Sequence, residues 1–267
     1  MDNEKIRLEG ISETLLIPLM GRALATKSRD GVLSDEKSLE IFESLNYDFD
    51  KFNDAHSRRS MMRTTIRTAI IDRVVQNHLA DHPEGTVVEI GCGLNSRFER
   101  LRPANIKWFD LDVPQVHKVW KQHFEETDRR AFLPFSAFDE QWITEAKKGG
   151  EGPFLFISEA SVIYFPKQKV RQLFQLLGTH FPGSYYLFDT AQPDFIESLT
   201  KNEDALKFCN AQIKWSINDV EELKEWVPTI EILNTIDLES SDHEYGALYP
   251  DDFQQAAEGY QLNLIRL

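Results

Sequence analysis

Two glycines and the acidic residue before them carry the most specific chemical information in this sequence of 267 residues. Gly91 and Gly93 follow directly on the apolar run Thr86–Ile90. Glycines at the end of a strand permit a tight turn and let a ligand approach the backbone closely. The third glycine of the dinucleotide-binding motif is missing, because Leu94 comes next, and Glu89 lies two positions before Gly91. A carboxylate here is a poor neighbour for phosphates and a good one for the ammonium or sulfonium group of S-adenosylmethionine (SAM).

A pair of aspartates at the end of the next apolar run, Ile106–Asp110, could bind the ribose of such a cofactor. Asp112 lies 21 positions after Gly91, near the spacing of about 20 residues at which an acid accepts hydrogen bonds from ribose hydroxyls. Asp110 and Asp112 point to the same side if the strand continues, so either could serve. Together with Glu89, this pattern predicts SAM rather than a nicotinamide dinucleotide as the cofactor. The expected product is S-adenosylhomocysteine, and no metal is expected.

The N-terminal part of the chain, up to about residue 82, has the apolar spacing of helices. The predicted helices span Ser12–Ala25, Ser34–Leu45 and His56–Ala80. In the third of them, an apolar residue recurs every four positions, at Met62, Ile66, Ile70 and Val74. This stripe predicts a helix that packs one face against a core.

From Thr86 onwards, short β-rich runs alternate with helical stretches. The predicted strands are Thr86–Ile90, Ile106–Asp110, Phe154–Ser158, Ser184–Asp189, Thr229–Ile236 and Tyr260–Leu267. The predicted helices between them are Val113–Glu126 and Lys167–Thr179. Such alternation indicates a mainly parallel sheet, and the last two strands fit an antiparallel pair at its edge. We therefore predict an α/β, Rossmann-like fold with a helical N-terminal cap (residues 1–82) and a cofactor-binding core (residues 83–267), forming one compact unit.

The composition narrows the class of partner. The chain has 30 basic and 44 acidic residues, a net charge of −14, which repels the phosphates of nucleic acids and anionic membrane surfaces. Its two cysteines, Cys92 and Cys209, cannot form a disulfide framework or a zinc cluster. No apolar run approaches the roughly 18 residues of a membrane span. We expect a cytoplasmic protein whose partner is a small-molecule acceptor, and neither nucleic acid nor a membrane.

Six segments spread over most of the chain carry a family resemblance. They are Thr14–Ala25 (TLLIPLMGRALA), Asn46–Phe52 (NYDFDKF), Arg67–Asp72 (RTAIID), Glu89–Leu101 (EIGCGLNSRFERL), Phe109–Val116 (FDLDVPQV) and Ile157–Pro166 (ISEASVIYFP). In this order they resemble the leucine carboxyl methyltransferase superfamily, and within it the branch of tetracenomycin-type polyketide O-methyltransferases. The resemblance implies a class I, SAM-dependent methyltransferase fold.

The resemblance also implies roles for individual residues. Arg67 matches the arginine that holds the methionine carboxylate of SAM, a group that a guanidinium can bind in bidentate fashion. Asp112 matches the ribose partner better than its neighbour two positions earlier. Asp139 matches an aspartate near the adenine amino group, although Phe138 stands where the family usually has arginine. Glu159 matches a glutamate that lines the cofactor pocket.

Catalytic residues are less clearly marked in the sequence. Methyl transfer depends mainly on holding the acceptor and the methyl group close and collinear, so a general base is optional. Two candidates are His243, in the acidic stretch between the last two predicted strands, and Tyr164, in a segment shared with the family. Arg97 could face the pocket or pair with Glu99 or Glu126.

The predicted function is transfer of a methyl group from SAM to a hydroxyl or carboxyl oxygen of a small molecule, such as an aromatic polyketide. One alternative is carboxyl methylation of a protein C-terminus or a small acid. Another is a SAM-binding protein that has lost catalysis. A nicotinamide-dependent oxidoreductase is disfavoured by the missing third glycine.

Overall fold

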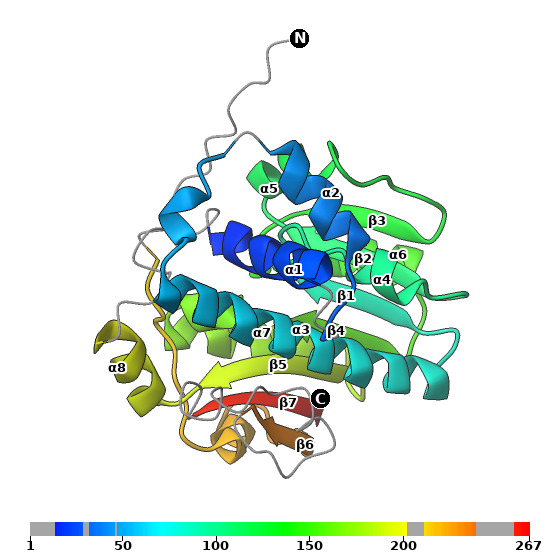
Figure 1. The fold of residues 1–267 in the computed structure, drawn as a ribbon. Helices are drawn as coiled ribbons and strands as arrows, with labels where there is room; N and C mark the ends of the chain where they lie inside the picture. The colour runs from blue at the N-terminus through cyan, green and yellow to red at the C-terminus, as the bar shows by residue number, and fades with distance from the viewer. Residues whose placement is uncertain (1–13, 29–31, 46, 202–210, 239–258) are drawn as a thin grey trace.

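A seven-stranded sheet forms the centre of the computed structural model, which describes residues 14–28, 32–45, 47–201, 211–238 and 259–267 (Figure 1). Its strands are β1 (Thr86–Ile90), β2 (Lys107–Asp112), β3 (Arg130–Pro134), β4 (Phe154–Ser158), β5 (Tyr185–Ala191), β6 (Glu231–Asp237) and β7 (Tyr260–Arg266). Their order is β3-β2-β1-β4-β5-β7-β6. Strands β1 to β5 are parallel, whereas β7 is antiparallel to both β5 and β6. The prediction of a mainly parallel sheet with an antiparallel pair at its edge is confirmed.

The helices of the described residues follow the same alternation. The α-helices are α1 (Leu16–Ser28), α2 (Glu36–Ser44), α3 (Ala55–Asp81), α4 (Arg97–Leu101), α5 (Pro114–Trp120), α6 (Gln141–Gly149), α7 (Lys167–His180) and α8 (Pro193–Lys201). Three short 3₁₀ helices are η2 (Asp50–Phe52), η3 (Val162–Tyr164) and η5 (Val220–Glu225). Helix α1 packs against both α2 and α3, and Figure 1 shows these three helices, in blue to cyan, together on one side of the sheet.

Helix α3 joins the N-terminal region to the core of the sheet. Its side chains Ile66, Ile70 and Ile71 are fully buried in one hydrophobic cluster with the strand residues Val88 and Phe156. The predicted stripe therefore packs as expected from Ile66 onwards. Its first member does not, because that methionine is 41% exposed. Residues before position 82 therefore help to form the core of the sheet that follows them. The boundary at residue 82 itself stays a prediction.

The chain between β2 and β4 differs most from the prediction. Helix α5 ends at Trp120 and not at Glu126. The Glu126 carboxylate instead accepts a hydrogen bond from the backbone N–H of Phe132 (2.8 Å) and so helps to begin β3. The sequence pattern predicts no strand here, because the run begins with a charged residue, Arg130. In the structure Arg130 is 1% exposed, with its Nε 2.6 Å from Oδ2 of Asp110 on the neighbouring strand.

Three observations bear on membranes, metals and redox chemistry. Within the described ranges, no helix is long and apolar enough to cross a membrane. The same residues contain no group of three or more His, Cys, Asp or Glu side chains that could hold a metal ion. Cys92 is a buried free thiol whose pKa is raised well above the usual value by burial.

Candidate active site

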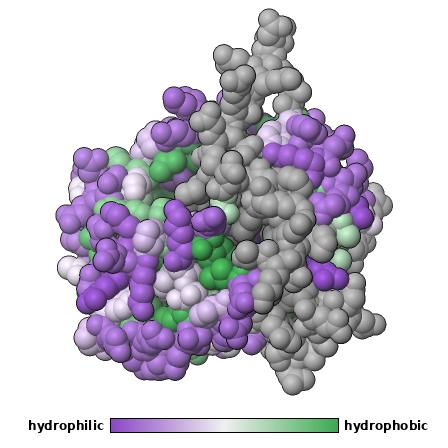
Figure 2. All heavy atoms as spheres, turned by 90° about the vertical axis from the view of Figure 1, so that its left-hand side faces the viewer, coloured by the Kyte–Doolittle hydropathy of each residue, from purple (hydrophilic) through white to green (hydrophobic). Residues whose placement is uncertain are grey.

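A cavity of about 650 Å³ lies at the carboxyl ends of the parallel strands. Ligands of open α/β sheets bind at this edge. The turn after β1, the end of β2 and the segment after β4 contribute Gly91, Asp112 and Glu159 to its lining, and α3 contributes Arg63 and Arg67. On the face of the molecule shown in Figure 2, hydrophobic side chains (green) come to the surface among hydrophilic ones. This cavity is the candidate active site.

The turn after β1 has a backbone that only glycine adopts easily. Gly91 has φ +68° and Gly93 has φ +53°, both in the left-handed region. A Cβ atom on Gly91 would lie 2.1 Å from the Oγ atom of Ser161. The backbone N–H of Gly91 donates to the carbonyl of Leu111 (2.7 Å), which ties this turn to the end of β2. Both glycines predicted from the sequence line the cavity, and a larger residue at either position would strain the backbone of this turn.

Asp112 is the aspartate that faces the cavity. Its Oδ2 atom accepts a hydrogen bond from the backbone N–H of Gly93 (2.9 Å), and its Oδ1 from that of Val113 (2.7 Å). Burial raises the pKa of Asp112 to about 6, against the effect of these two donors. Asp110, in contrast, is fully buried away from the cavity, where it accepts hydrogen bonds from Arg130 Nε and Trp108 Nε1. The structure therefore distinguishes the two candidates that the spacing left open.

Glu89 lines the cavity with a carboxylate that is only half satisfied. Its Oε1 atom accepts hydrogen bonds from Asn95 Nδ2 (2.8 Å) and from Arg97. Its Oε2 atom is buried and has no hydrogen-bond partner among the described residues. Burial raises the pKa of Glu89 to about 7, although Arg97 opposes the shift. An acceptor of this kind is available to a cationic ligand.

Arg67 and Glu159 form an ion pair across the cavity wall. Arg67 Nε lies 3.1 Å from Glu159 Oε1, which also accepts a hydrogen bond from Thr68 Oγ1 (2.6 Å). Burial alone would raise the pKa of Glu159, but Arg67 and Arg97 outweigh it and hold that pKa well below the usual range. Both residues of the pair line the cavity, as the family resemblance implied. They join α3 to the end of β4.

Tyr260 is a cavity residue that sequence reasoning missed. Its hydroxyl accepts a hydrogen bond from Arg67 Nη1 (3.2 Å) and donates one to Asp189 Oδ2. The Asp189 atom also accepts a hydrogen bond from the backbone N–H of Ala160 (2.7 Å). The antiparallel pairing of β7 with β5 places Tyr260 opposite Ala191. No local motif marks this tyrosine, because only that pairing brings it to the site.

The other predicted residues have different outcomes. Tyr164, in η3, is 7% exposed and lines the cavity. Asp139 is exposed and is not part of the lining, whereas Phe138 is. His243 lies outside the described residues.

The two expectations for Arg97 are wrong. It is fully buried and does not line the cavity, and it pairs with Asp72, Glu89 and Glu159 instead of the two glutamates proposed from the sequence. Of those two, Glu99 pairs with another arginine and Glu126 accepts a backbone N–H. Sequence proximity was misleading here, because the partners of Arg97 come from α3 and from the ends of β1 and β4.

The sheet order, the glycine turn after β1 and the acid at the end of β2 are the features of a Rossmann-like fold that binds its ligand at the carboxyl ends of the strands. They fit the class of SAM-dependent methyltransferases. A solved structure agrees with this class. The SAM-dependent methyltransferase of Anabaena variabilis superposes with a TM-score of 0.53 at 16% sequence identity. The match covers 73% of this chain and 84% of that one. At this identity, the likeness concerns the fold.

The sequence comparisons identify the family. The family model for leucine carboxyl methyltransferase matches residues 16–178, and the chain belongs to this family of SAM-dependent methyltransferases. A relative is the tetracenomycin polyketide synthesis O-methyltransferase TcmP of Streptomyces glaucescens, 29% identical over 84% of this chain and 82% of that protein. Another is the S-adenosyl-L-methionine-dependent methyltransferase dpfgK of Gibberella zeae, 26% identical over 85% of this chain and 82% of that protein.

Proposed function

We propose that this protein transfers the methyl group of SAM to an oxygen atom of a small aromatic molecule. The observation that supports this most is the chemistry of the cavity lining, which falls into two groups. One group is polar and suits SAM. The polar group contains Arg67, Glu89, Gly91, Gly93, Asp112 and Glu159. The other group is mostly aromatic and suits a flat acceptor. It contains Tyr164, Phe165, Phe195 and Ile213.

The polar group fits the functional groups of SAM. The unpartnered Oε2 atom of Glu89 can accept a hydrogen bond from the ammonium group. Arg67 supplies the cation for the methionine carboxylate, since a guanidinium binds that group in bidentate fashion. Asp112 supplies acceptor oxygens for the ribose hydroxyls. The glycine turn leaves space for the ligand between these side chains.

The reaction requires little from the protein beyond binding and orientation. SAM supplies a methyl carbon that its sulfonium already activates, so the protein gains most by holding the acceptor oxygen close and in line. The aromatic lining provides flat apolar surface for an aromatic ring and excludes water from the cavity. Acceptors of this kind are consistent with the name of the Streptomyces relative, an O-methyltransferase of polyketide synthesis.

A carboxylate acceptor is the second candidate, and two cations favour it. Arg63 and Lys169 both line the cavity, and the lining contains no histidine among the residues that the structure describes. A carboxylate is attracted to cations and is already ionised, so its methylation needs no general base. A phenol with a pKa near 10 gains from a base or from a cation that favours phenolate. Small aromatic acids combine both properties of the lining.

The experiment that tests the acceptor class is a methyl-transfer screen with labelled SAM. The panel contains phenols, small aromatic and aliphatic carboxylic acids, and peptides that differ in their C-terminal residue. We expect label in the aromatic compounds. Label in the peptides alone would replace this proposal with carboxyl methylation of a protein. SAM binding with no product from any acceptor class would favour a protein without catalysis.

Replacing Asp112 with alanine is expected to weaken SAM binding at least tenfold, about 1.4 kcal/mol. The reason is that the variant loses both carboxylate oxygens offered to the ribose and frees the N–H of Gly93 that shapes the turn. Calorimetric titration with SAM measures the effect. Asp128→Ala is the matched control, because that aspartate is exposed and lies outside the lining. Unchanged affinity in folded Asp112→Ala protein would mean that the ribose binds elsewhere.

Binding of S-adenosylhomocysteine is expected to strengthen as the pH rises towards neutral. Burial raises the pKa of Glu89 to about 7, so at lower pH its carboxyl group holds a proton that the ligand's ammonium must displace. The dissociation constant should therefore rise by up to about tenfold for each pH unit below 7. Titrations at several pH values test this, with 5′-methylthioadenosine as the comparison ligand. It lacks the ammonium, so its affinity should depend less on pH, through the Asp112 carboxyl group alone. Equal pH dependence for both ligands would contradict the role of Glu89.

A further inference from the structure

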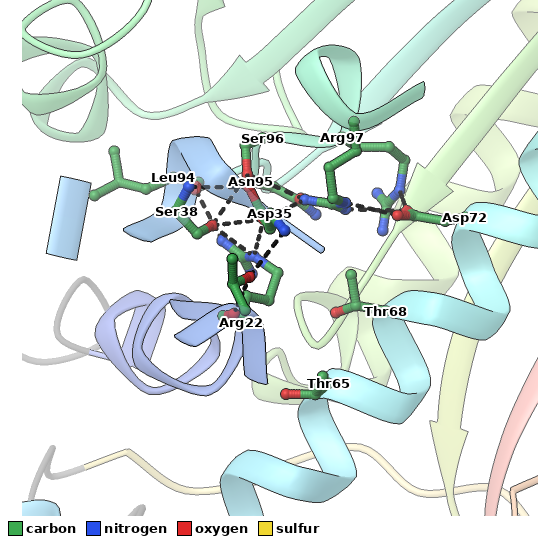
Figure 3. A network of polar contacts seen from close by, with 12 residues as sticks. Arg22, Asp35, Ser38, Thr65, Thr68, Asp72, Leu94, Asn95, Ser96 and Arg97 are labelled. Atoms are coloured by element: carbon green, nitrogen blue, oxygen red, sulfur yellow. Dashed lines mark hydrogen bonds and ion pairs between the residues drawn. The ribbon is translucent and has the colours of Figure 1, made fainter. Parts of the chain in front are cut away.

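A buried network of charged and hydroxyl side chains lies behind the glycine turn (Figure 3). Its centre is Asp35, which caps the N-terminus of α2. The Asp35 side chain is fully buried, and its Oδ2 atom accepts hydrogen bonds from Arg22 Nε (3.0 Å) and Arg100 Nη1 (2.8 Å). The hydroxyl groups of Ser38 and Ser96 donate to the same atom, each at 2.6 Å. Four donors from three different helical segments therefore meet on one carboxylate.

The charges in this network compensate one another. Burial alone would raise the pKa of Asp35, but Arg100 and Arg22 outweigh it and lower the pKa to about 2. The carboxylate is therefore ionised under all ordinary conditions. Removing such a cluster of charges from water costs free energy, and the cost is offset only where most of its hydrogen bonds are made. Such clusters hold their parts in a single arrangement.

The network reaches the residues that directly follow the glycine turn. Arg22 Nη2 donates to the carbonyl of Leu94 (3.0 Å), across 72 positions of sequence. Ser96 is held by Asp35, as described above. The N-terminal helices therefore fix the positions on both sides of Asn95. Leu15, just before α1, packs against the hydrophobic cluster that contains Cys92 and Leu94.

Asn95 connects the network to residues that line the cavity. Its side-chain amide donates to Glu89 Oε1 (2.8 Å) and to Glu159 Oε2 (3.3 Å), and its carbonyl oxygen accepts a hydrogen bond from Arg100 Nη2 (3.1 Å). One amide thus bridges two carboxylates that line the cavity, both of which also pair with Arg97. Figure 3 shows Asn95 next to Ser96, with Asp35 and Arg22 beneath them.

We infer that Arg22 and Asp35 are positioning residues of the methyltransferase, which act through Leu94, Ser96 and Asn95 to place the carboxylates that receive the amino-acid part of SAM. The inference rests on the proposed assignment of SAM to the cavity. It extends the SAM site to α1, α2 and the segment that joins them. Helix α1 also lines the cavity directly, with Ile17, Pro18 and Arg22, whereas Asp35 acts only through the network.

The test is a comparison of two ligands on the Asp35→Asn variant. Asn keeps the shape of the side chain and removes the charge that balances two arginines. We expect S-adenosylhomocysteine to bind at least tenfold more weakly. We expect 5′-methylthioadenosine, which shares the nucleoside but lacks the amino-acid part, to change less than threefold. A general loss of packing would weaken both ligands alike, so the ratio of the two effects separates positioning from stability.

Two further variants keep the test decisive if Asp35→Asn does not fold. Ser96→Ala removes one hydroxyl group and no charge, and it should weaken S-adenosylhomocysteine binding by about fivefold, again with little effect on 5′-methylthioadenosine. Leu173→Ala is the stability control, because this side chain on α7 is 1% exposed and belongs to a different hydrophobic cluster from Leu94 of the network. It should lower the melting temperature and leave both affinities unchanged.

The outcomes are distinguishable. If wild-type protein binds neither ligand, the proposed cofactor site fails. If wild-type protein binds both ligands, and the folded Asp35→Asn and Ser96→Ala variants bind S-adenosylhomocysteine as tightly as wild type, the positioning role is overturned. Equal weakening of both ligands in these variants would also overturn it.

Discussion

The Arg67→Ala variant is expected to bind SAM at least tenfold more weakly than the wild-type protein, a loss of about 1.4 kcal/mol or more. Arg67 is held at the cavity wall by Glu159 and by the hydroxyl of Tyr260. Its guanidinium is 7% exposed, so the ligand's carboxylate would meet it in a setting poor in water. Charge-assisted hydrogen bonds are strongest in such settings.

Two control variants on α3 and one control ligand accompany this prediction. Arg59→Ala removes an exposed arginine from α3 and should leave SAM binding unchanged. Arg67→Lys should recover only part of the affinity, because an ammonium lacks the fork that binds two oxygens at once. 5′-methylthioadenosine has no carboxylate, so Arg67→Ala should scarcely affect it. Full SAM affinity in folded Arg67→Ala protein would move the carboxylate site elsewhere.

The fold could be predicted where single segments bury all their residues. Strands β1 and β4 are buried along their whole length, and their apolar runs are visible in the sequence without knowledge of any partner. Strand β3 could not be predicted in this way. The burial of Arg130 depends on Asp110, 20 positions earlier on the neighbouring strand. A buried charge is read from the sequence as a surface residue until its partner is known.

The same distinction applies to the site. Gly91 and Gly93 could be predicted because they stand at the end of a recognisable strand. At the end of the next strand the spacing offered two aspartates, and the family resemblance favoured Asp112. Arg67 and Glu159 were reached only through the family resemblance, since nothing local separates them from other charged residues. These five residues all line the cavity.

Asp139 lies outside the cavity lining, although two neighbouring residues of its segment belong to it. The side chains of Phe135 and Phe138 line the cavity, so the segment is well placed. The Asp139 carboxylate instead accepts a hydrogen bond from the backbone N–H of Ser136 (3.2 Å), within its own turn. Aspartate often satisfies backbone groups in this way. The family resemblance therefore matches a segment that reaches the cavity, and the local turn holds the Asp139 carboxylate outside the lining. Its role near the adenine stays a prediction.

Replacing Arg97 with methionine is expected to have the largest effect on stability, a loss of about 3 to 5 kcal/mol in the free energy of unfolding. Arg97 is fully buried between the carboxylates of Asp72, Glu89 and Glu159, whose side chains are at most 9% exposed. Methionine fills similar space without the charge. The loss arises because the desolvated carboxylates lose their shared cation and must either stay charged without it or take up a proton. Guanidinium-induced unfolding near neutral pH measures it, and exposed Arg59→Met is the control.

The dependence of this loss on pH identifies its cause. Burial raises the pKa of Glu89 even in the presence of Arg97, and removing that cation raises the folded-state pKa further. A carboxyl group whose folded-state pKa lies above its unfolded value destabilises the fold when the pH is high, and protonation relieves this as the pH falls. The deficit of Arg97→Met relative to wild type should therefore shrink between about pH 8 and pH 5. A deficit that stays constant over this range would assign the loss to packing instead of charge.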